Sequence, residues 1–111
     1  SHKGACHKHL EQYSAAIKTC EKGLETDDQR PDLYNTMGFC HYMLKNHETA
    51  ITCFVRALEV DPSQAINYAN IGSNYRELGD TKQAIQFYEM ALEIDPTITF
   101  ARENIDKLKN K

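Results

Sequence analysis

The first ten residues, SHKGACHKHL, gather four side chains that can bind a metal ion: His2, Cys6, His7 and His9. Residues four and seven apart share one face of a helix, so His2, Cys6 and His9 could lie together. Because a zinc site needs three or four ligands in fixed geometry, the cluster permits a metal or redox site. The alternative, which we favour, is a truncated helix that carries these residues without a metal.

Outside this cluster, the sequence lacks the spacing of a reactive or cofactor-binding motif. The other cysteines, Cys20, Cys40 and Cys53, form no C-x-x-C pair. Four cysteines could form two disulfides in a secreted chain, or serve as small buried hydrophobic residues in a reduced one. We favour the reduced, cytoplasmic state, because the helices inferred below need no crosslinks. A Gly-rich phosphate loop and a G-x-S-x-G motif are both absent, so we expect no enzyme, no catalytic residue and no cofactor.

Composition indicates a soluble helical domain that binds neither nucleic acid nor membrane. Of the 111 residues, 26% are charged and 41% are hydrophobic, and the net charge is −3. With only three prolines and five glycines, the chain favours helices. No run of Lys or Arg exceeds two residues, which argues against a nucleic-acid or polybasic membrane surface. No apolar stretch approaches the roughly 18 residues that a membrane-spanning helix needs.

The chain contains an internal repeat with a period of 34 residues. Residues 31–64 align with residues 65–98 without a gap, and ten of the 34 positions are identical. A fixed period of this size indicates stacked supersecondary units. In each unit the apolar residues recur at spacings of three and four, which predicts helices. Lys45-Asn46 and Gly79-Asp80 mark the turn between two helices, and an Asp-Pro pair ends each unit.

Small residues recur at the same places in both units. A large side chain there would push two helices beyond the roughly 8–10 Å at which helices pack. We therefore assign a structural role to these residues, as the places where the two helices of a hairpin touch. They are Gly38, Ala50, Ala57, Gly72, Ala84 and Ala91.

The second unit resembles a tetratricopeptide repeat. The family pattern is a large apolar or aromatic residue, then Leu-Gly, Tyr, Ala, an aromatic, Ala and Pro at set spacing. All eight positions are matched in the second unit, by Tyr68, Ile71, Gly72, Tyr75, Ala84, Tyr88, Ala91 and Pro96. Seven are matched in the first unit, where His41 stands in place of the usual Tyr. The resemblance implies an all-α, right-handed solenoid of helical hairpins.

The resemblance also divides the chain. Residues 31–64 and 65–98 are the two full repeats. Residues 1–30 keep the register of a repeat that lacks its first four residues, so we expect the remnant of a first helix, then a second helix, and a longer parent array. Residues 99–111 are expected to form a capping helix that is polar on one face. They could instead begin a fourth repeat, although Asp106 stands where that repeat needs Gly.

In this family the first helices of the repeats line a concave groove, and the groove residues of peptide-binding members occupy set positions. Carried over to this chain, the groove comprises Asn35, Phe39, Tyr42, Met43, Ile66, Asn70, Ser73 and Arg76. Phe39, Tyr42 and Met43 are large apolar residues on a face that the core does not need, as in a binding surface. The resemblance thus implies an adaptor or scaffold for a protein or peptide partner. One alternative is that an upstream repeat covers these three residues. Another is that the protein self-associates through its truncated N-terminal edge, or acts as a spacer in a larger assembly.

One subgroup of the family grips the C-terminal carboxylate of chaperones with a clamp of Lys, Asn and Arg residues. Asn70 matches one position of this clamp. Asn35 and Phe39 stand where Lys and Asn are needed, and Phe100 and Asn104 stand where Lys and Arg are needed. Without those cations a carboxylate has no charge-assisted partner, so we expect no clamp activity.

Overall fold

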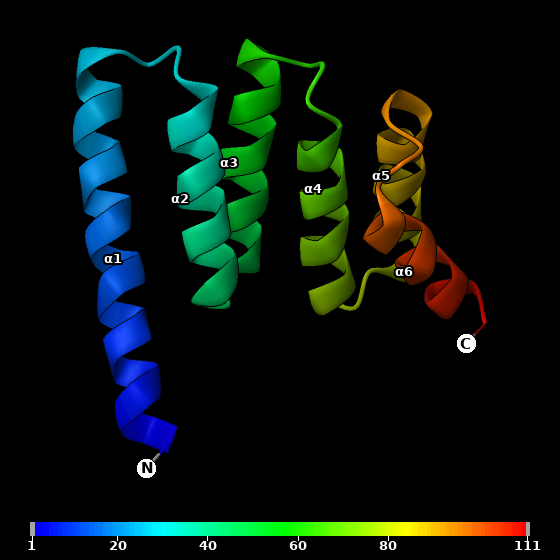
Figure 1. Ribbon diagram of the computed structural model, residues 1–111, viewed down its shortest axis with the longest axis horizontal. Helices are drawn as coiled ribbons and strands as arrows, with labels where there is room; N and C mark the ends of the chain where they lie inside the picture. Colours follow the sequence, from blue (N-terminus) through cyan, green and yellow to red (C-terminus); the bar gives the residue numbers. More distant parts are fainter. Residues whose placement is uncertain (1, 111) are drawn as a thin grey trace.

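A computed structural model shows a row of antiparallel helices (Figure 1). It describes the backbone of residues 2–110 and the side chains of residues 10–110. The helices are α1 (His2–Thr26), α2 (Pro31–Met43), α3 (His47–Val60), α4 (Ala65–Glu77), α5 (Thr81–Ile94) and α6 (Thr99–Lys109). The described residues contain no strand. The all-α solenoid predicted from the repeat is therefore confirmed.

Two helical hairpins, α2–α3 and α4–α5, form the centre of the row. Each helix packs on its neighbours along the chain, most extensively within the two hairpins. Between the helices of each hairpin the chain turns at one residue with positive φ, Lys45 at 66° and Gly79 at 84°. Asp80 then caps α5, because its carboxylate accepts a hydrogen bond from the Gln83 backbone N–H at 3.2 Å. The turn positions agree with those predicted from the sequence.

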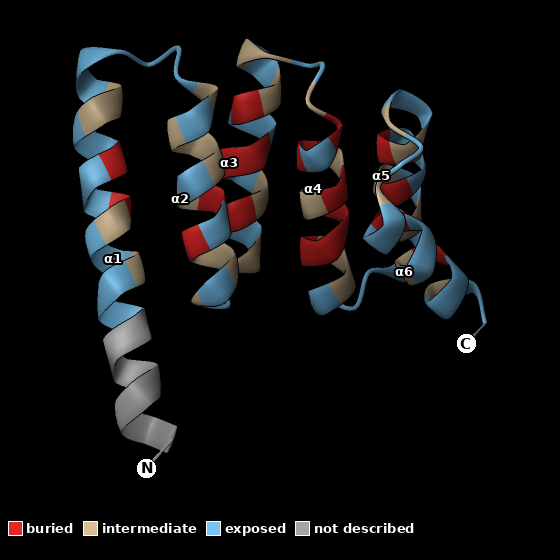
Figure 2. Ribbon diagram, in the orientation of Figure 1, coloured by how far each residue is buried: buried red, intermediate tan, exposed pale blue. Residues whose placement is uncertain are grey.

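Large rings pack against the smallest residues inside each hairpin. Phe54 and Tyr88 are among the largest fully buried or nearly buried side chains, and Figure 2 shows the buried residues on the inner sides of the helices. A Cβ atom at Gly38 would lie 2.7 Å from the Phe54 ring. A Cβ atom at Gly72 would lie 3.1 Å from the Ala84 carbonyl oxygen. The two glycines therefore permit the close approach of helices that the spacing of small residues predicted.

The structure differs from the sequence expectation at the N-terminus. Instead of a helix remnant and a second helix, α1 is one continuous helix of 25 residues. The position that corresponds to Lys45 and Gly79 is Glu11, and Gln12 follows it. Gln12 stands where the later turns have Asn46 and Asp80, whose types are favoured just before a helix, whereas glutamine favours the helix interior. The helix therefore continues through the place where the register alone predicted a turn.

Helix α6 lies against α5 at the other end of the row (Figure 1). It buries Ala101 and Ile105 and exposes Arg102, Glu103 and Asp106. This amphipathic pattern is what covers the last repeat of a solenoid with a polar surface. Within the described residues, none of the helices combines the length and apolar character that crossing a membrane requires.

Candidate functional site

A cavity of about 130 Å³ opens between α2 and α4. Its lining comprises Phe39, Tyr42, Phe54, Asn70, Ser73 and Asn74. Four of these residues belong to the groove set expected from the sequence, and they come from two different repeats. Phe54 comes from α3, behind the other two helices, so three helices form the cavity. The structure thus brings half of the expected groove residues around one opening.

The other expected groove residues lie apart from this cavity. Met43 and Ile66 are exposed, with 40% and 44% of their surface accessible. Asn35 is half-buried, and its side chain donates a hydrogen bond to the Gln64 side chain at 3.1 Å. Asn35 therefore joins α2 to the start of α4, in addition to any contact with a partner.

Arg76 joins three helices and is not a free cation. Its guanidinium donates to the Asn104 side chain of α6 at 2.7 Å and to the Tyr42 hydroxyl of α2 at 3.2 Å. It also forms an ion pair with Glu77 at 3.0 Å. These hydrogen bonds link α2 to α4 and α4 to α6, so alternate helices of the chain form one row. The charge of Arg76 is already balanced within the protein.

The polar atoms of Ser73 and Asn74 are also satisfied inside the protein. The Ser73 and Tyr88 hydroxyls are hydrogen-bonded at 2.8 Å. The Asn74 amide donates to the Asn70 carbonyl at 2.8 Å, and its oxygen lies 3.0 Å from His47 Nδ1. In contrast, the side-chain amide of Asn70 makes no hydrogen bond within the described part of the chain.

Sequence reasoning missed three residues at this site. Phe54 and Asn74 complete the cavity, and the Tyr13 ring of α1 lies edge-on to the Phe39 ring with 6.2 Å between the centroids. The repeat register assigns Phe54 to the core. In the structure Phe54 is buried in the core and also lines the cavity. Tyr13 lies one period before His47, which contacts Asn74 of α4, so a comparison of the repeats could have indicated that Tyr13 faces α2.

The thiols of the described residues are buried rather than reactive. Cys20, Cys40 and Cys53 are free and buried, and burial raises the pKa of each thiol. A thiol with a raised pKa is a poor nucleophile and a poor metal ligand. No group of three or more His, Cys, Asp and Glu side chains from residue 10 onward is arranged to hold a metal ion. The side chains of His2, Cys6, His7 and His9 lie outside the described residues.

The Cys53 thiol should make stability depend on pH in alkaline solution. Burial raises its pKa from 9.0 to about 11, and the charges of Glu21 and Cys20 contribute less. Between these values the folded protein keeps the thiol proton while the unfolded chain loses it, so stability falls as the pH rises. The shift corresponds to about 2–3 kcal/mol. Unfolding by urea at about pH 8 and about pH 10.5 should show a smaller loss for Cys53→Ala than for the wild type. Equal losses would contradict this role of the thiol.

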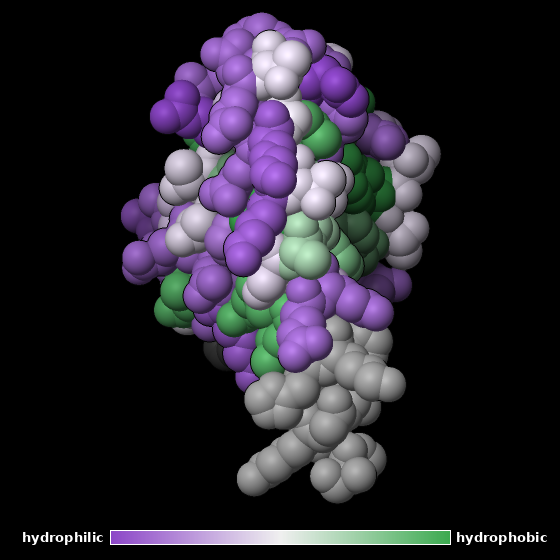
Figure 3. Space-filling view, turned by 90° about the vertical axis from the view of Figure 1, so that its left-hand side faces the viewer, coloured by the Kyte–Doolittle hydropathy of each residue, from purple (hydrophilic) through white to green (hydrophobic). Residues whose placement is uncertain are grey.

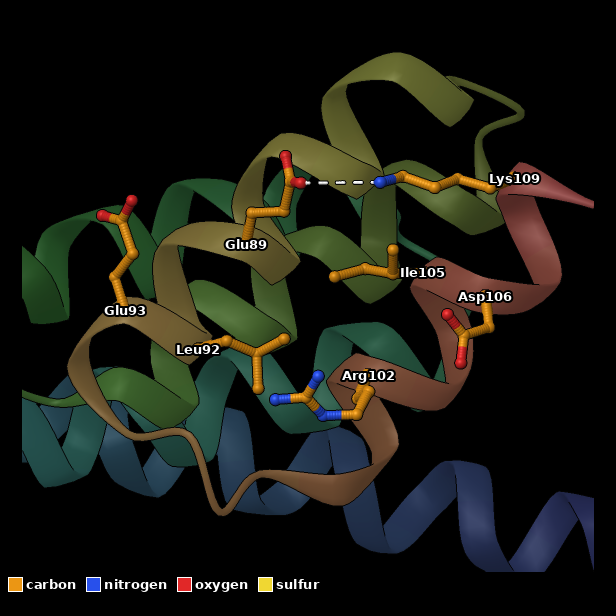
Figure 4. A pocket seen from close by; sticks show the side chains of 7 residues that line it. All are labelled: Glu89, Leu92, Glu93, Arg102, Ile105, Asp106 and Lys109. Carbon is orange, nitrogen blue, oxygen red and sulfur yellow. Dashed lines mark ion pairs between the residues drawn. The ribbon is translucent and has the colours of Figure 1, made fainter.

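A larger opening of about 560 Å³ lies at the C-terminal edge, between α5 and α6 (Figure 4). Leu92 and Ile105 are its apolar residues. The remaining lining residues are charged, namely Glu89, Glu93, Arg102, Asp106 and Lys109. Lys109 and Glu89 form an ion pair at 3.7 Å across it. Such a mixed-charge surface suits the solvated end of a solenoid better than a binding pocket.

The N-terminal edge of the row is also largely polar from residue 10 onward. Figure 3 shows this side of the molecule, where hydrophilic residues cover much of the face. Leu10 is the only large hydrophobic residue of α1 that is exposed in this part. The exposed polar and charged residues of the described part include Glu11, Gln12, Lys18, Glu21, Lys22 and Glu25.

The fold defines a helical-repeat scaffold with a cavity between α2 and α4. The tetratricopeptide repeat family model matches residues 29–97, which is more than half of the chain. The chain therefore belongs to the tetratricopeptide repeat family. Repeats of this family are protein-interaction modules rather than catalytic folds.

Solved structures of the same fold are similar at low identity. The crystal structure of MamA is 24% identical with a TM-score of 0.84, and the match covers 88% of this chain and 57% of MamA. This chain thus spans little more than half of that protein. The first tetratricopeptide repeat domain of Spaghetti (RPAP3), bound to the HSP90 peptide SRMEEVD, is 24% identical with a TM-score of 0.84, and the match covers 97% of this chain and 87% of that one.

A third structure is the Yersinia enterocolitica type III secretion chaperone SycD in complex with a peptide of the translocator YopD. It is 13% identical with a TM-score of 0.84, and the match covers 96% of this chain and 88% of SycD. No curated protein sequence matches this chain significantly. At these identities the structural similarity establishes the fold of this chain. The peptides bound by RPAP3 and SycD are properties of those proteins.

Proposed function

We propose that the protein binds a segment of a partner protein in the groove that α2, α4 and α6 line. The observation that carries this proposal is the exposure of large apolar residues along these helices. Phe39 is 53% exposed, and Met43, Ile66 and Phe100 are also exposed. Exposed apolar surface beside a cavity is typical of binding sites. Relatives of the same fold, RPAP3 and SycD, were solved with peptides.

We expect the partner to differ from the acidic peptide bound by RPAP3. The positions that supply cations in a carboxylate clamp hold Phe100 and Asn104 in this chain. Arg76, the cation nearest the cavity, is already paired with Glu77. A terminal carboxylate would therefore be desolvated without an ionic partner. The peptide SRMEEVD should show no saturable binding at micromolar concentration.

Photo-crosslinking tests the proposal and identifies the partner in the same experiment. Benzoyl-phenylalanine replaces Phe39 in one protein and Met90, on α5, in a control protein. After irradiation in a lysate of the source organism, we expect adducts at position 39 that are absent at position 90. The crosslinked segment is then synthesised and its affinity measured by fluorescence anisotropy. Self-association would instead give adducts between two copies of this chain.

Two methionines provide matched controls for the affinity measurement. Met43 and Met90 are both 40% exposed, but only Met43 belongs to the row of α2, α4 and α6. We expect Met43→Ser to weaken binding about tenfold, because it removes apolar contact area worth about 1.4 kcal/mol. Met90→Ser should bind within twofold of the wild type. Equal affinities for both variants would overturn the proposal.

A further inference from the structure

We infer that the cavity between α2 and α4 selects a partner segment that inserts one apolar side chain and carries no acidic residue beside it. This inference rests on the proposed function and adds the chemical class of the ligand. It depends on three properties of the cavity: its volume, the state of its polar groups, and the charge around it.

The volume suits one side chain of intermediate size. The cavity measures about 130 Å³, and an apolar cavity of about 150 Å³ accommodates benzene. A leucine, isoleucine, methionine or phenylalanine side chain therefore fits, whereas an indole is too large. Phe39, Tyr42 and Phe54 supply three aromatic rings around this space. Rings of this kind interact well with an aliphatic or phenyl group.

The polar residues of the lining do not require a polar ligand. The hydroxyl of Ser73 is bonded to Tyr88, and the amide of Asn74 is bonded to His47 and to the Asn70 carbonyl. Inside the cavity a polar side chain would lose water and find only the Tyr42 hydroxyl, which accepts a hydrogen bond from Arg76 and keeps its own O–H donor. Asn70 is the exception, because its amide has an unused donor and acceptor at the mouth of the cavity. It can bind the peptide backbone on either side of the inserted side chain.

The charge around the cavity excludes acidic ligands. All six lining residues are uncharged. The Arg76 guanidinium is hydrogen-bonded to Tyr42, Asn104 and Glu77. Because Glu77 already pairs with this guanidinium at 3.0 Å, a carboxylate next to the inserted side chain would meet a cation whose charge is balanced, with a second negative charge beside it. An uncharged segment binds without that cost.

Selection of peptides from a phage-displayed library of random 12-residue sequences tests this inference. We expect the peptides that bind the wild-type protein to share one aliphatic or phenyl residue with no Asp or Glu on either side. Replacing that residue by Ala in a synthetic peptide should weaken binding at least tenfold, and replacing it by Asp should abolish binding. A set of selected peptides rich in acidic residues would overturn the inference.

Two substitutions at equivalent repeat positions separate the cavity from the rest of the groove. Asn70→Leu places an apolar side chain at the cavity mouth and removes the amide, and we expect at least tenfold weaker binding. Thr36→Leu makes the same kind of change 34 residues before it in the chain, away from the cavity, and should stay within twofold of the wild type. Asn70→Asp keeps the size of the side chain and adds a negative charge, and it should also weaken binding.

The same measurements distinguish failure of this inference from failure of the proposed function. Circular dichroism and urea unfolding first establish that each variant is folded. Peptides that lose affinity for Met43→Ser but bind Asn70→Leu and Asn70→Asp like the wild type would overturn the cavity inference and leave groove binding intact. If no selected peptide loses affinity for Met43→Ser or for either Asn70 variant, both proposals are wrong.

Discussion

Replacing Tyr88 by alanine is expected to lower the free energy of unfolding by about 3–5 kcal/mol. Tyr88 is completely buried in α5, where its ring packs against Gly72 and lies edge-on to Phe100 at a centroid distance of 6.4 Å. Alanine would leave a cavity that the flanking helices cannot fill without moving. It would also leave the Ser73 hydroxyl without its partner at 2.8 Å. Because a domain is stable by about 5–15 kcal/mol, this loss would bring the protein close to unfolding.

Tyr88→Phe separates the ring from the hydroxyl. The phenyl ring keeps the packing and removes only the hydrogen bond to Ser73, so we expect a loss of about 0.5–1.5 kcal/mol. Urea unfolding with linear extrapolation measures both variants. If Tyr88→Phe were as destabilising as Tyr88→Ala, the stability of this repeat would depend on the hydroxyl rather than on the ring.

The helices of the two full repeats could be predicted from the sequence because their causes are local and occur twice. The positive φ of Gly79 and the Asp80 cap act within a few residues of the chain. The small residue Gly72 and the large residue Tyr88 recur as Gly38 and Phe54 one period before them. Because the same pattern occurs in both repeats, a chance match is improbable. The helix boundaries therefore follow from the alignment of residues 31–64 with residues 65–98.

The N-terminal turn was mispredicted because register alone does not specify a turn. The apolar positions of the first repeat, such as Ile17 and Cys20, are buried as the register requires. A turn additionally needs a residue that tolerates positive φ or a cap. Gln12 stands where Asn46 and Asp80 begin the second helices of the later repeats, and it is not a capping residue, so the hydrogen bonds of the helix continue. The rest of the repeat pattern is present.

The cavity could not be predicted because it depends on contacts between distant residues. Ser73 was expected at the groove surface, but its hydroxyl pairs with Tyr88 and the residue is buried. Arg76 was expected in the groove, where its partners Tyr42 and Asn104 lie 34 and 28 residues away in the sequence. A periodic pattern assigns a side chain to a face of the helix. Which neighbour it then binds depends on the shapes of three helices together.

Gly38→Val is expected to destabilise the protein by about 1–3 kcal/mol, although valine favours the helix more than glycine does. A Cβ atom at this position would lie 2.7–2.9 Å from three carbon atoms of the Phe54 ring. Phe54 is almost completely buried, so its ring cannot move into solvent. The gain in helix propensity is below about 1 kcal/mol and does not offset the clash. The hairpin of α2 and α3 would therefore have to open.

A double-mutant cycle with Phe54→Leu tests whether the clash is the cause. Leucine removes ring atoms near Gly38, so Gly38→Val should cost less in the Phe54→Leu background, with a coupling energy of about 0.5–3 kcal/mol. Gly79→Ala serves as the control. It lies at a φ of 84° with nothing within 4 Å of its Cβ position, so its cost of about 1–2 kcal/mol arises from the backbone. That cost should be the same in both backgrounds, whereas additivity of Gly38→Val and Phe54→Leu would show that the ring does not limit the size of residue 38.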